Sequence, residues 1–144
     1  MRGFSLINLS LAIGILLLVV GVTLPYGIAS YRAQGLYQDA ANLVYFLESA
    51  RNRAMVDVED YAVRREDVEL LQYRGPSFSD RNMAEDQVLE LSAQVAMEGP
   101  VEMYFQAGSG FPRLGSEEYV LKVAGQTYRV HINSLGLVSS ELAQ

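Results

Sequence analysis

The sequence predicts an α+β fold in which a long N-terminal helix packs against a head built from an antiparallel β-sheet. Three observations lead to this prediction. Residues 4–28 are almost entirely apolar, residues 36–54 carry apolar side chains at helical spacing, and the chain after Asp57 falls into short runs separated by turn residues. One helix followed by a succession of strands is typical of the α+β class.

The apolar stretch at residues 4–28 is long enough to cross a membrane. No charged residue occurs from Gly3 to Tyr31, and about 20 helical residues cover the ~30 Å hydrocarbon core of a bilayer. A cleaved secretory signal is disfavoured because its apolar region is only about 7–15 residues long. A plain single-span anchor fits the length, with Arg2 and the α-amino group held in the cytoplasm by the positive-inside rule.

The second half of the predicted helix has one apolar and one polar face, because its apolar side chains recur at spacings of three and four. The apolar face comprises Leu36, Ala40, Leu43, Leu47, Ala50 and Ala54, and the polar face comprises Gln38, Asn42, Glu48, Arg51 and Asn52. The aromatic residues of this region, Tyr31, Tyr37, Tyr45 and Phe46, are interpreted as packing residues. We expect one helix over residues 4–55, kinked or loosened at Pro25, because proline removes a backbone donor.

Short strands are expected along the rest of the chain. The candidates, chosen for alternation and for β-branched or aromatic residues, are residues 68–73, 87–97, 101–105, 119–123, 126–132 and 137–138. Ala124–Gly125 separates two of these runs and predicts a β-hairpin. The turn-rich stretch GSGFPRLG separates two others.

The composition limits the partners and the chemistry that are open to the chain. Its 144 residues carry a net charge of −6 and include one lysine, so nucleic acid is a poor default partner. The absence of cysteine excludes disulfides, thiolate metal sites and cysteine nucleophiles. About 110 residues remain beyond Tyr31, which is enough for one small domain with its own core.

The sequence favours a protein that is not an enzyme. Its one histidine, His131, falls on the polar face of a predicted strand together with Arg129. Neither a GxSxG motif nor a phosphate-binding glycine loop occurs, and Glu117–Glu118 is interpreted as the charged start of a strand.

The loop at residues 76–86 is the remaining candidate for a ligand site. Its acidic residues are Asp80, Glu85 and Asp86. Their spacing matches no known calcium loop, so a solvated loop is the preferred interpretation. No cofactor and no metal ion are expected.

The first residues resemble the N-terminal signature of the type IV pilin superfamily, which includes pilins and the pseudopilins of secretion and competence systems. In that family a short basic leader ends in glycine and is followed by Phe-Ser/Thr-Leu-Ile-Glu, an apolar run and a proline. Here Gly3 ends a three-residue leader, Phe4-Ser5-Leu6-Ile7 follows, and Pro25 stands near the end of the apolar run. The resemblance covers residues 2–55. The tail, with VHINSLGLV, resembles the H-type minor pseudopilins of type II secretion.

The resemblance implies a pathway and a division of the chain. A prepilin peptidase would cut between Gly3 and Phe4, and Phe4 would be N-methylated. Residues 1–3 would be the leader, 4–28 the transmembrane and filament-core half of the helix, 29–56 its amphipathic half, and 57–144 the β-rich head. The chain would sit in the inner membrane as a single-pass protein with its head outside the cytoplasm, and would then enter a filament or pseudopilus.

The partners implied by the resemblance are other pilins or pseudopilins, the prepilin peptidase and the assembly platform of the inner membrane. Contact with other subunits would run through the N-terminal helices, with Asn8 and Pro25 as assembly residues. An exposed charged face at Arg51–Arg53 would contact neighbouring heads.

Asn8 departs from the family pattern, which has glutamate at this position. In the family that carboxylate is thought to pair with the N-terminal amine of a neighbouring subunit. The neutral Asn8 amide can accept a hydrogen bond from an ammonium group but forms no ion pair. Three interpretations stay open: a subunit at the filament tip or active in initiation, a low-copy shaft subunit, and a polar residue without an assembly role.

The sequence therefore predicts a minor pilin or pseudopilin, a structural subunit for a type IV pilus, a type II secretion system or a competence pseudopilus. The alternative is a membrane-anchored binding module with one span that is never cut. Direct DNA binding, as by a minor pilin for DNA uptake, is disfavoured by the net negative charge of the chain.

Overall fold

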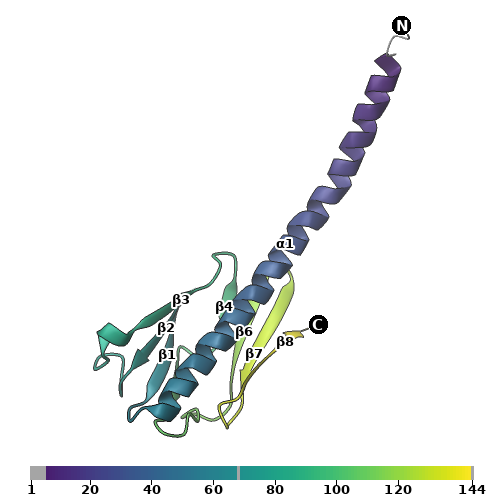
Figure 1. Cartoon of the computed structure of the whole chain (residues 1–144). Helices are drawn as coiled ribbons and strands as arrows, with labels where there is room; N and C mark the ends of the chain where they lie inside the picture. Colours follow the sequence, from purple (N-terminus) through teal and green to yellow (C-terminus); the bar gives the residue numbers. More distant parts are fainter. Residues whose placement is uncertain (1–5, 68, 144) are drawn as a thin grey trace.

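The computed structural model describes residues 6–67 and 69–143, and these form one long helix and eight strands. The helix α1 runs from Leu6 to Val56 and is continuous through Pro25. The strands are β1 (Tyr61–Glu66), β2 (Glu69–Arg74), β3 (Gln87–Glu90), β4 (Ala96–Glu98), β5 (Glu102–Phe105), β6 (Glu117–Val123), β7 (Gln126–Ile132) and β8 (Val138–Ala143), with a short 3-10 helix at Met83–Glu85 between β2 and β3. The first half of α1 projects from the head, and its second half lies against the strands (Figure 1).

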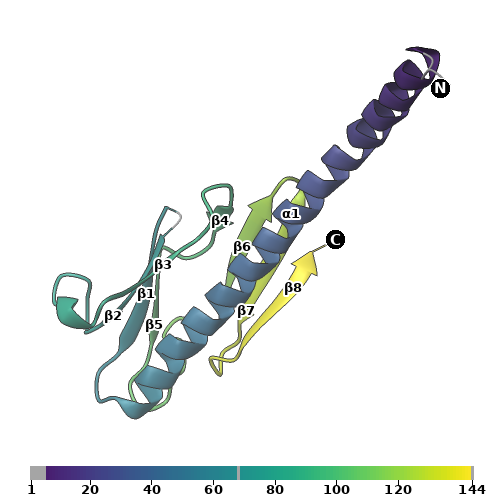
Figure 2. The ribbon, with the colours of Figure 1, turned by 45° about the horizontal axis from the view of Figure 1, so that its top comes forward.

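The head contains two antiparallel sheets rather than the single sheet that the sequence suggested. One sheet has the strand order β3-β2-β1-β5, and the other has the order β4-β6-β7-β8. Strands of both sheets contact α1, and Figure 2 shows β8 on one side of the helix and β6, β1 and β5 on the other. The predicted α+β class and antiparallel pairing are confirmed.

The core forms where the second half of α1 meets the two sheets. All six residues of the predicted apolar face are at most 1% exposed: Leu36, Ala40, Leu43, Leu47, Ala50 and Ala54. They belong to one cluster with Tyr61, Val63 and Leu70 of the first sheet and Tyr119, Leu121, Val130 and Ile132 of the second. Burial of this apolar surface is the main force that holds the helix on the head.

The C-terminal end of α1 is held by a loop of the head. The N–H of Gly108 donates to the carbonyl of Ala54 (2.7 Å), and the N–H of Asp57 donates to the carbonyl of Arg53 (2.9 Å). These bonds satisfy carbonyls that have no partner within the helix. The loop thereby closes the end of the helix and fixes where β1 begins.

The hairpin of β6 and β7 was predicted correctly. Ala124 and Gly125 have φ angles of 48° and 84°, which is the two-residue turn whose twist matches the flanking strands. The cross-strand pairs run from Glu117 with Ile132 to Val123 with Gln126.

Three strand predictions need correction. The run at residues 87–97 is two strands, β3 and β4, which belong to different sheets. β1 was not predicted, although it lies in the middle of its sheet, between β2 and β5. β8 extends to Ala143 instead of ending at Val138.

Two predictions about the helix surface also need correction. Arg51 is half-buried with its Nε atom shielded from solvent, because it packs against the turns that contain Gly110 and Gly136. Tyr31, Tyr37 and Tyr45 were expected to pack but are exposed. Tyr37 makes only an edge contact with Tyr128, at 6.1 Å between ring centroids.

Candidate functional site

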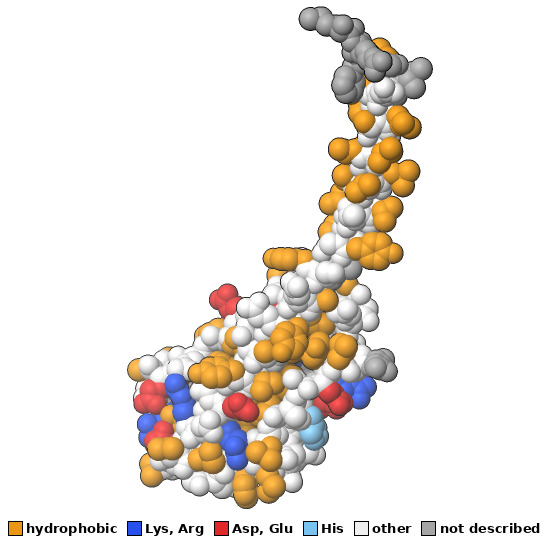
Figure 3. Space-filling view, turned by 45° about the vertical axis from the view of Figure 1, so that its right-hand side comes forward, with side chains coloured by type: hydrophobic (Ala, Val, Ile, Leu, Met, Phe, Trp, Pro, Cys, Tyr) orange, Lys and Arg blue, Asp and Glu red, His pale blue; other side chains and the backbone are white. Residues whose placement is uncertain are grey.

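The projecting half of α1, residues 6–28, is the candidate site, because it is an exposed apolar surface without a partner in the head. Its large apolar side chains are exposed, from Leu6 (84%) to Ile28 (52%). Figure 3 shows hydrophobic side chains around the described part of this projection. Within the described residues, α1 is the one helix long and apolar enough to cross a membrane, and its most hydrophobic window has a mean hydropathy of 2.3 with no burial.

The hydroxyl groups in this half are satisfied by the helix itself. Ser10 Oγ donates to the carbonyl of Leu6 and Thr23 Oγ1 to the carbonyl of Val19, each at 2.9 Å. Such bonds to the preceding turn remove the need for a polar partner. Gly14 and Gly21, which are seven residues apart, leave open space where a side chain would begin. The surface is therefore suited to lipid or to another apolar helix.

The predicted site residues are spread along the helix. Gly3 and Phe4 lie outside the described residues. Asn8 is exposed within the apolar half, and Pro25 lies in the helical backbone. At 1.5 Å per residue, Asn8 and Pro25 are about 25 Å apart along the axis, so they do not form one local site.

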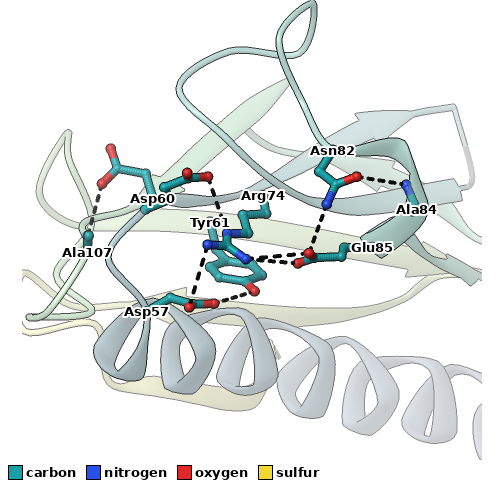
Figure 4. Close-up of polar contacts among 9 residues, drawn as sticks. Asp57, Asp60, Tyr61, Arg74, Asn82, Ala84, Glu85 and Ala107 are labelled. Carbon is teal, nitrogen blue, oxygen red and sulfur yellow. Dashed lines mark hydrogen bonds and ion pairs between the residues drawn. The ribbon is translucent and has the colours of Figure 1, made fainter.

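A cluster of charged residues fixes the start of the head relative to the end of α1. Arg74 of β2 faces Asp57 (3.8 Å), Glu59 (3.2 Å) and Glu85 (3.4 Å), and Tyr61 donates its hydroxyl hydrogen to Asp57 (2.7 Å; Figure 4). Desolvation lowers the pKa of Arg74, but the three carboxylates outweigh it and raise the pKa overall. The sequence offered no signal for this cluster, because its members come from three separate stretches of the chain, at residues 57–61, 74 and 85.

Tyr61 makes the stability of the head depend on pH in the alkaline range. Burial raises its pKa to about 12, and the hydrogen bond to Asp57 acts in the same direction. Since an unfolded tyrosine has a pKa of about 10, the folded state favours the neutral phenol. This contribution to stability is present below about pH 10 and is lost as the pH rises toward about 12.

We expect the free energy of unfolding to fall over that alkaline window, and Tyr61→Phe to make the fall shallower. The measurement is urea unfolding of the full-length chain in detergent micelles at a series of pH values. Burial also raises the pKa of Tyr73 and Tyr119, so part of the slope should persist in the variant. An unchanged slope after Tyr61→Phe would contradict the prediction.

The outer face of the first sheet carries a second cluster that sequence reasoning missed. The ring of Phe78, from the loop after β2, lies between the guanidinium groups of Arg64 (4.0 Å) and Arg81 (3.8 Å). Tyr73 contacts the same ring edge-on, at 5.7 Å between centroids. These contacts hold the loop at residues 75–86 against the sheet.

The acidic residues of that loop each have a separate partner. Asp80 accepts a hydrogen bond from Ser77 (2.9 Å), Asp86 pairs with Arg81 (2.9 Å), and Glu85 pairs with Arg74. In the described part of the chain no group of three or more potential ligands converges on a metal position. His131 is exposed on β7, as predicted.

Comparison with solved structures places this architecture among known ones. The type IV minor pilin FimU of Pseudomonas aeruginosa matches in two crystal forms, with TM-scores of 0.61 and 0.64 and identities of 13% and 14%. These matches cover 75% and 78% of this chain and 97% and 95% of the FimU chains. The chain has a type IV pilin-like fold.

A pseudopilin shares the pilin-like fold as well. The minor pseudopilin EpsH from the type 2 secretion system of Vibrio cholerae matches with a TM-score of 0.53 and 13% identity, over 72% of this chain and 92% of EpsH. No family model matches the sequence, and no curated protein matches it. The similarity is therefore carried by the three-dimensional structure, and the resemblance inferred from the first residues is confirmed at the level of the fold.

Proposed function

We propose that this pilin-like chain is a minor pilin or pseudopilin, a structural subunit rather than an enzyme. One observation carries the proposal: the first half of α1 is apolar and exposed, while the apolar face of the second half is buried against the strands of the head. A lone soluble domain gains nothing from such a projection, because a large exposed apolar surface favours association or membrane insertion. The matching structures described above are those of a minor pilin and a minor pseudopilin.

The two halves of α1 suggest how the subunit works. Residues 4–28 serve first as a single-pass anchor in the inner membrane and later as part of a helical filament core, through contact with other subunits. Transfer from lipid to a filament core leaves the Ser10 and Thr23 hydroxyls satisfied, because both bond within the helix. The head of residues 57–144 stays outside the cytoplasm throughout.

Processing is part of the proposal. A prepilin peptidase cuts between Gly3 and Phe4, and the new amine of Phe4 is methylated. Asn8 then lies four residues from the mature N-terminus, where it offers an amide oxygen but no negative charge. This chemistry fits a subunit at the tip or in initiation, or a low-copy shaft subunit, better than it fits a bulk filament subunit.

The intact mass of the chain tests the proposal. We expect co-expression with the prepilin peptidase of its host to remove the mass of Met-Arg-Gly, with or without one added methyl group. A Gly3→Val variant serves as the control and should keep the full mass, since the peptidase needs an open backbone at the cut.

An uncut chain, in cells that process a known pilin, would instead support the alternative of an anchored binding module. Cleavage at another position would also contradict the assignment of Gly3 and Phe4. The mass of the methyl group separates methylation from cleavage alone.

A further inference from the structure

A groove lies at the neck of the molecule, where α1 leaves the head. Its upper part, about 420 Å³, lies along α1 from Thr23 to Arg32 and is bordered by Gln94 from the loop between β3 and β4. A second hollow of about 500 Å³ continues along α1 to Asn42 and shares Tyr31, Arg32 and Gln94. We call the upper part the neck groove.

The neck groove falls at the expected surface of the membrane. Leu6–Ile28 spans about 34 Å as a helix, slightly more than the ~30 Å hydrocarbon core. Arg32 lies four residues further, about 6 Å along the axis, and so within the headgroup layer, which is roughly 5–8 Å thick. Tyr26 and Tyr31 are 74% and 79% exposed there, and tyrosine is enriched at this depth.

The side chains of the neck groove suit a phospholipid. Arg32 is exposed and makes no ion pair with any described residue, in contrast to Arg64, Arg74 and Arg81 of the head. Guanidinium groups bind phosphate oxygens through paired hydrogen bonds. Leu24 and Ile28 line the side of the groove toward the membrane, where an acyl chain would lie.

The nearby carboxylate does not oppose an anion in the neck groove. Asp39 lines only the second hollow and is seven residues beyond Arg32, about 10 Å along the axis. It is 6% exposed and accepts a hydrogen bond from the N–H of Ser92 (3.3 Å). That bond holds the loop between β3 and β4 against α1 and so keeps Gln94 at the groove.

We propose that the neck groove binds the phosphate of an anionic phospholipid headgroup through Arg32, with Tyr31 and Gln94 beside it, so that the head rests on the membrane surface before assembly. This inference rests on the proposed function, because it requires the apolar half of α1 to span a bilayer. Its consequence is a fixed height and tilt of the head above the membrane.

The absence of cysteine makes a clean test available, since one introduced cysteine can carry a spin label. The labelled variants of the full-length chain are Ala93→Cys beside the groove, Ser79→Cys in a distant loop, and Leu16→Cys in the apolar half. Each is placed in vesicles of phosphatidylcholine alone or mixed with phosphatidylglycerol, and label depth is measured by electron paramagnetic resonance.

We expect the label at residue 93 to lie in the headgroup layer, the label at 79 in water and the label at 16 in the hydrocarbon core. Arg32→Gln should shift the label at 93 toward water and lower the preference for phosphatidylglycerol about fivefold, the effect of one basic residue at an anionic surface. Arg129→Gln, which removes the same charge from an exposed position on β7 that does not line the groove, should change neither quantity.

Several results would overturn the inference. A label at residue 93 that stays in water while the label at 16 is deep in lipid would reject the neck groove and leave the anchor intact. No response to Arg32→Gln would reject phosphate binding. Short distances between labels at 93 on different molecules would show that a second copy fills the groove. A label at residue 16 in water would reject the anchor, and with it the proposed function.

Discussion

Replacing Gly136 by alanine is expected to lower the free energy of unfolding of the full-length chain by about 2–5 kcal/mol. Gly136 has a φ angle of +75°, a conformation that costs a residue with a Cβ atom about 1–2 kcal/mol. The added methyl would also clash with the carbonyl oxygen of Gly110 and lie 2.9 Å from Arg51 Nε. Backbone on one side and a half-buried arginine on the other leave little room to relax, and overpacking of this kind costs about 1–3 kcal/mol.

Gly125→Ala is the matched control for this prediction. Gly125 has a similar φ angle of +84°, but open space surrounds the position of its missing Cβ. The control should therefore lose only the backbone term, about 1–2 kcal/mol. Urea unfolding in detergent micelles, followed by the near-ultraviolet circular dichroism of the nine tyrosines, measures both variants. Equal decreases in the free energy of unfolding would show that the contact with Gly110 and Arg51 does not contribute to the effect.

Leu47→Ala is expected to destabilise the chain by about 2–5 kcal/mol. Leu47 is fully buried on the inner face of α1, and truncation leaves a cavity between the helix and the sheets. Removal of buried methylene groups loses both their transfer free energy and the packing of the cavity wall.

Leu114→Ala makes the same chemical change at a site that is 78% exposed, and should stay within about 0.5 kcal/mol of the parent. The same unfolding measurement compares the two. If Leu47→Ala were as mild as the control, the second half of α1 would not be held by its apolar face. The description of the core as the junction between α1 and the two sheets would then be wrong.

The helix could be read from the sequence because two simple patterns define it. Its first half is apolar throughout, and its second half repeats at three and four residues. Six positions chosen from that repeat are buried, at most 1% exposed each. The tight turn at Ala124–Gly125 was equally easy to predict, because few residue pairs adopt two positive φ angles.

The strand errors have physical causes. β1 contains Arg64, Arg65 and Glu66, and three consecutive charged residues are not expected in a central strand. The strand accommodates Arg65 because its guanidinium donates to the carbonyl of Met97 (2.7 Å). β8 is an edge strand whose side chains are largely exposed, so its pairing with β7 comes from backbone bonds rather than from a hydrophobic pattern.

The run at residues 87–97 shows how alternation can mislead. Leu89, Leu91, Val95 and Met97 keep the same parity, and the last three are buried. Between them the chain turns at Ser92–Val95, with a hydrogen bond of 2.9 Å from the N–H of Val95 to the carbonyl of Ser92. Alternation with a period of two predicts which side chains face a core. It does not predict that the chain passes from one sheet to another.

The candidate site could be predicted only in part from the sequence, for a similar reason. The apolar half of α1 is a local feature and was predicted, whereas the neck groove needs a loop that is about 60 residues away in the chain. The Arg51 prediction failed because the polar face of a helix was assumed to meet solvent. Two glycine turns of the head cover that part of the face instead.

Because α1 is continuous, the orientation of the head about the helix axis is fixed relative to the apolar half. The helix has no break between Leu6 and Val56, so the direction in which the head points is set by the residue count between the two halves. One residue inserted near Gly35 would turn the head by about 100° and raise it by about 1.5 Å, and seven would nearly restore its bearing. A chain of this design tolerates changes in side chains more readily than changes in length at the neck.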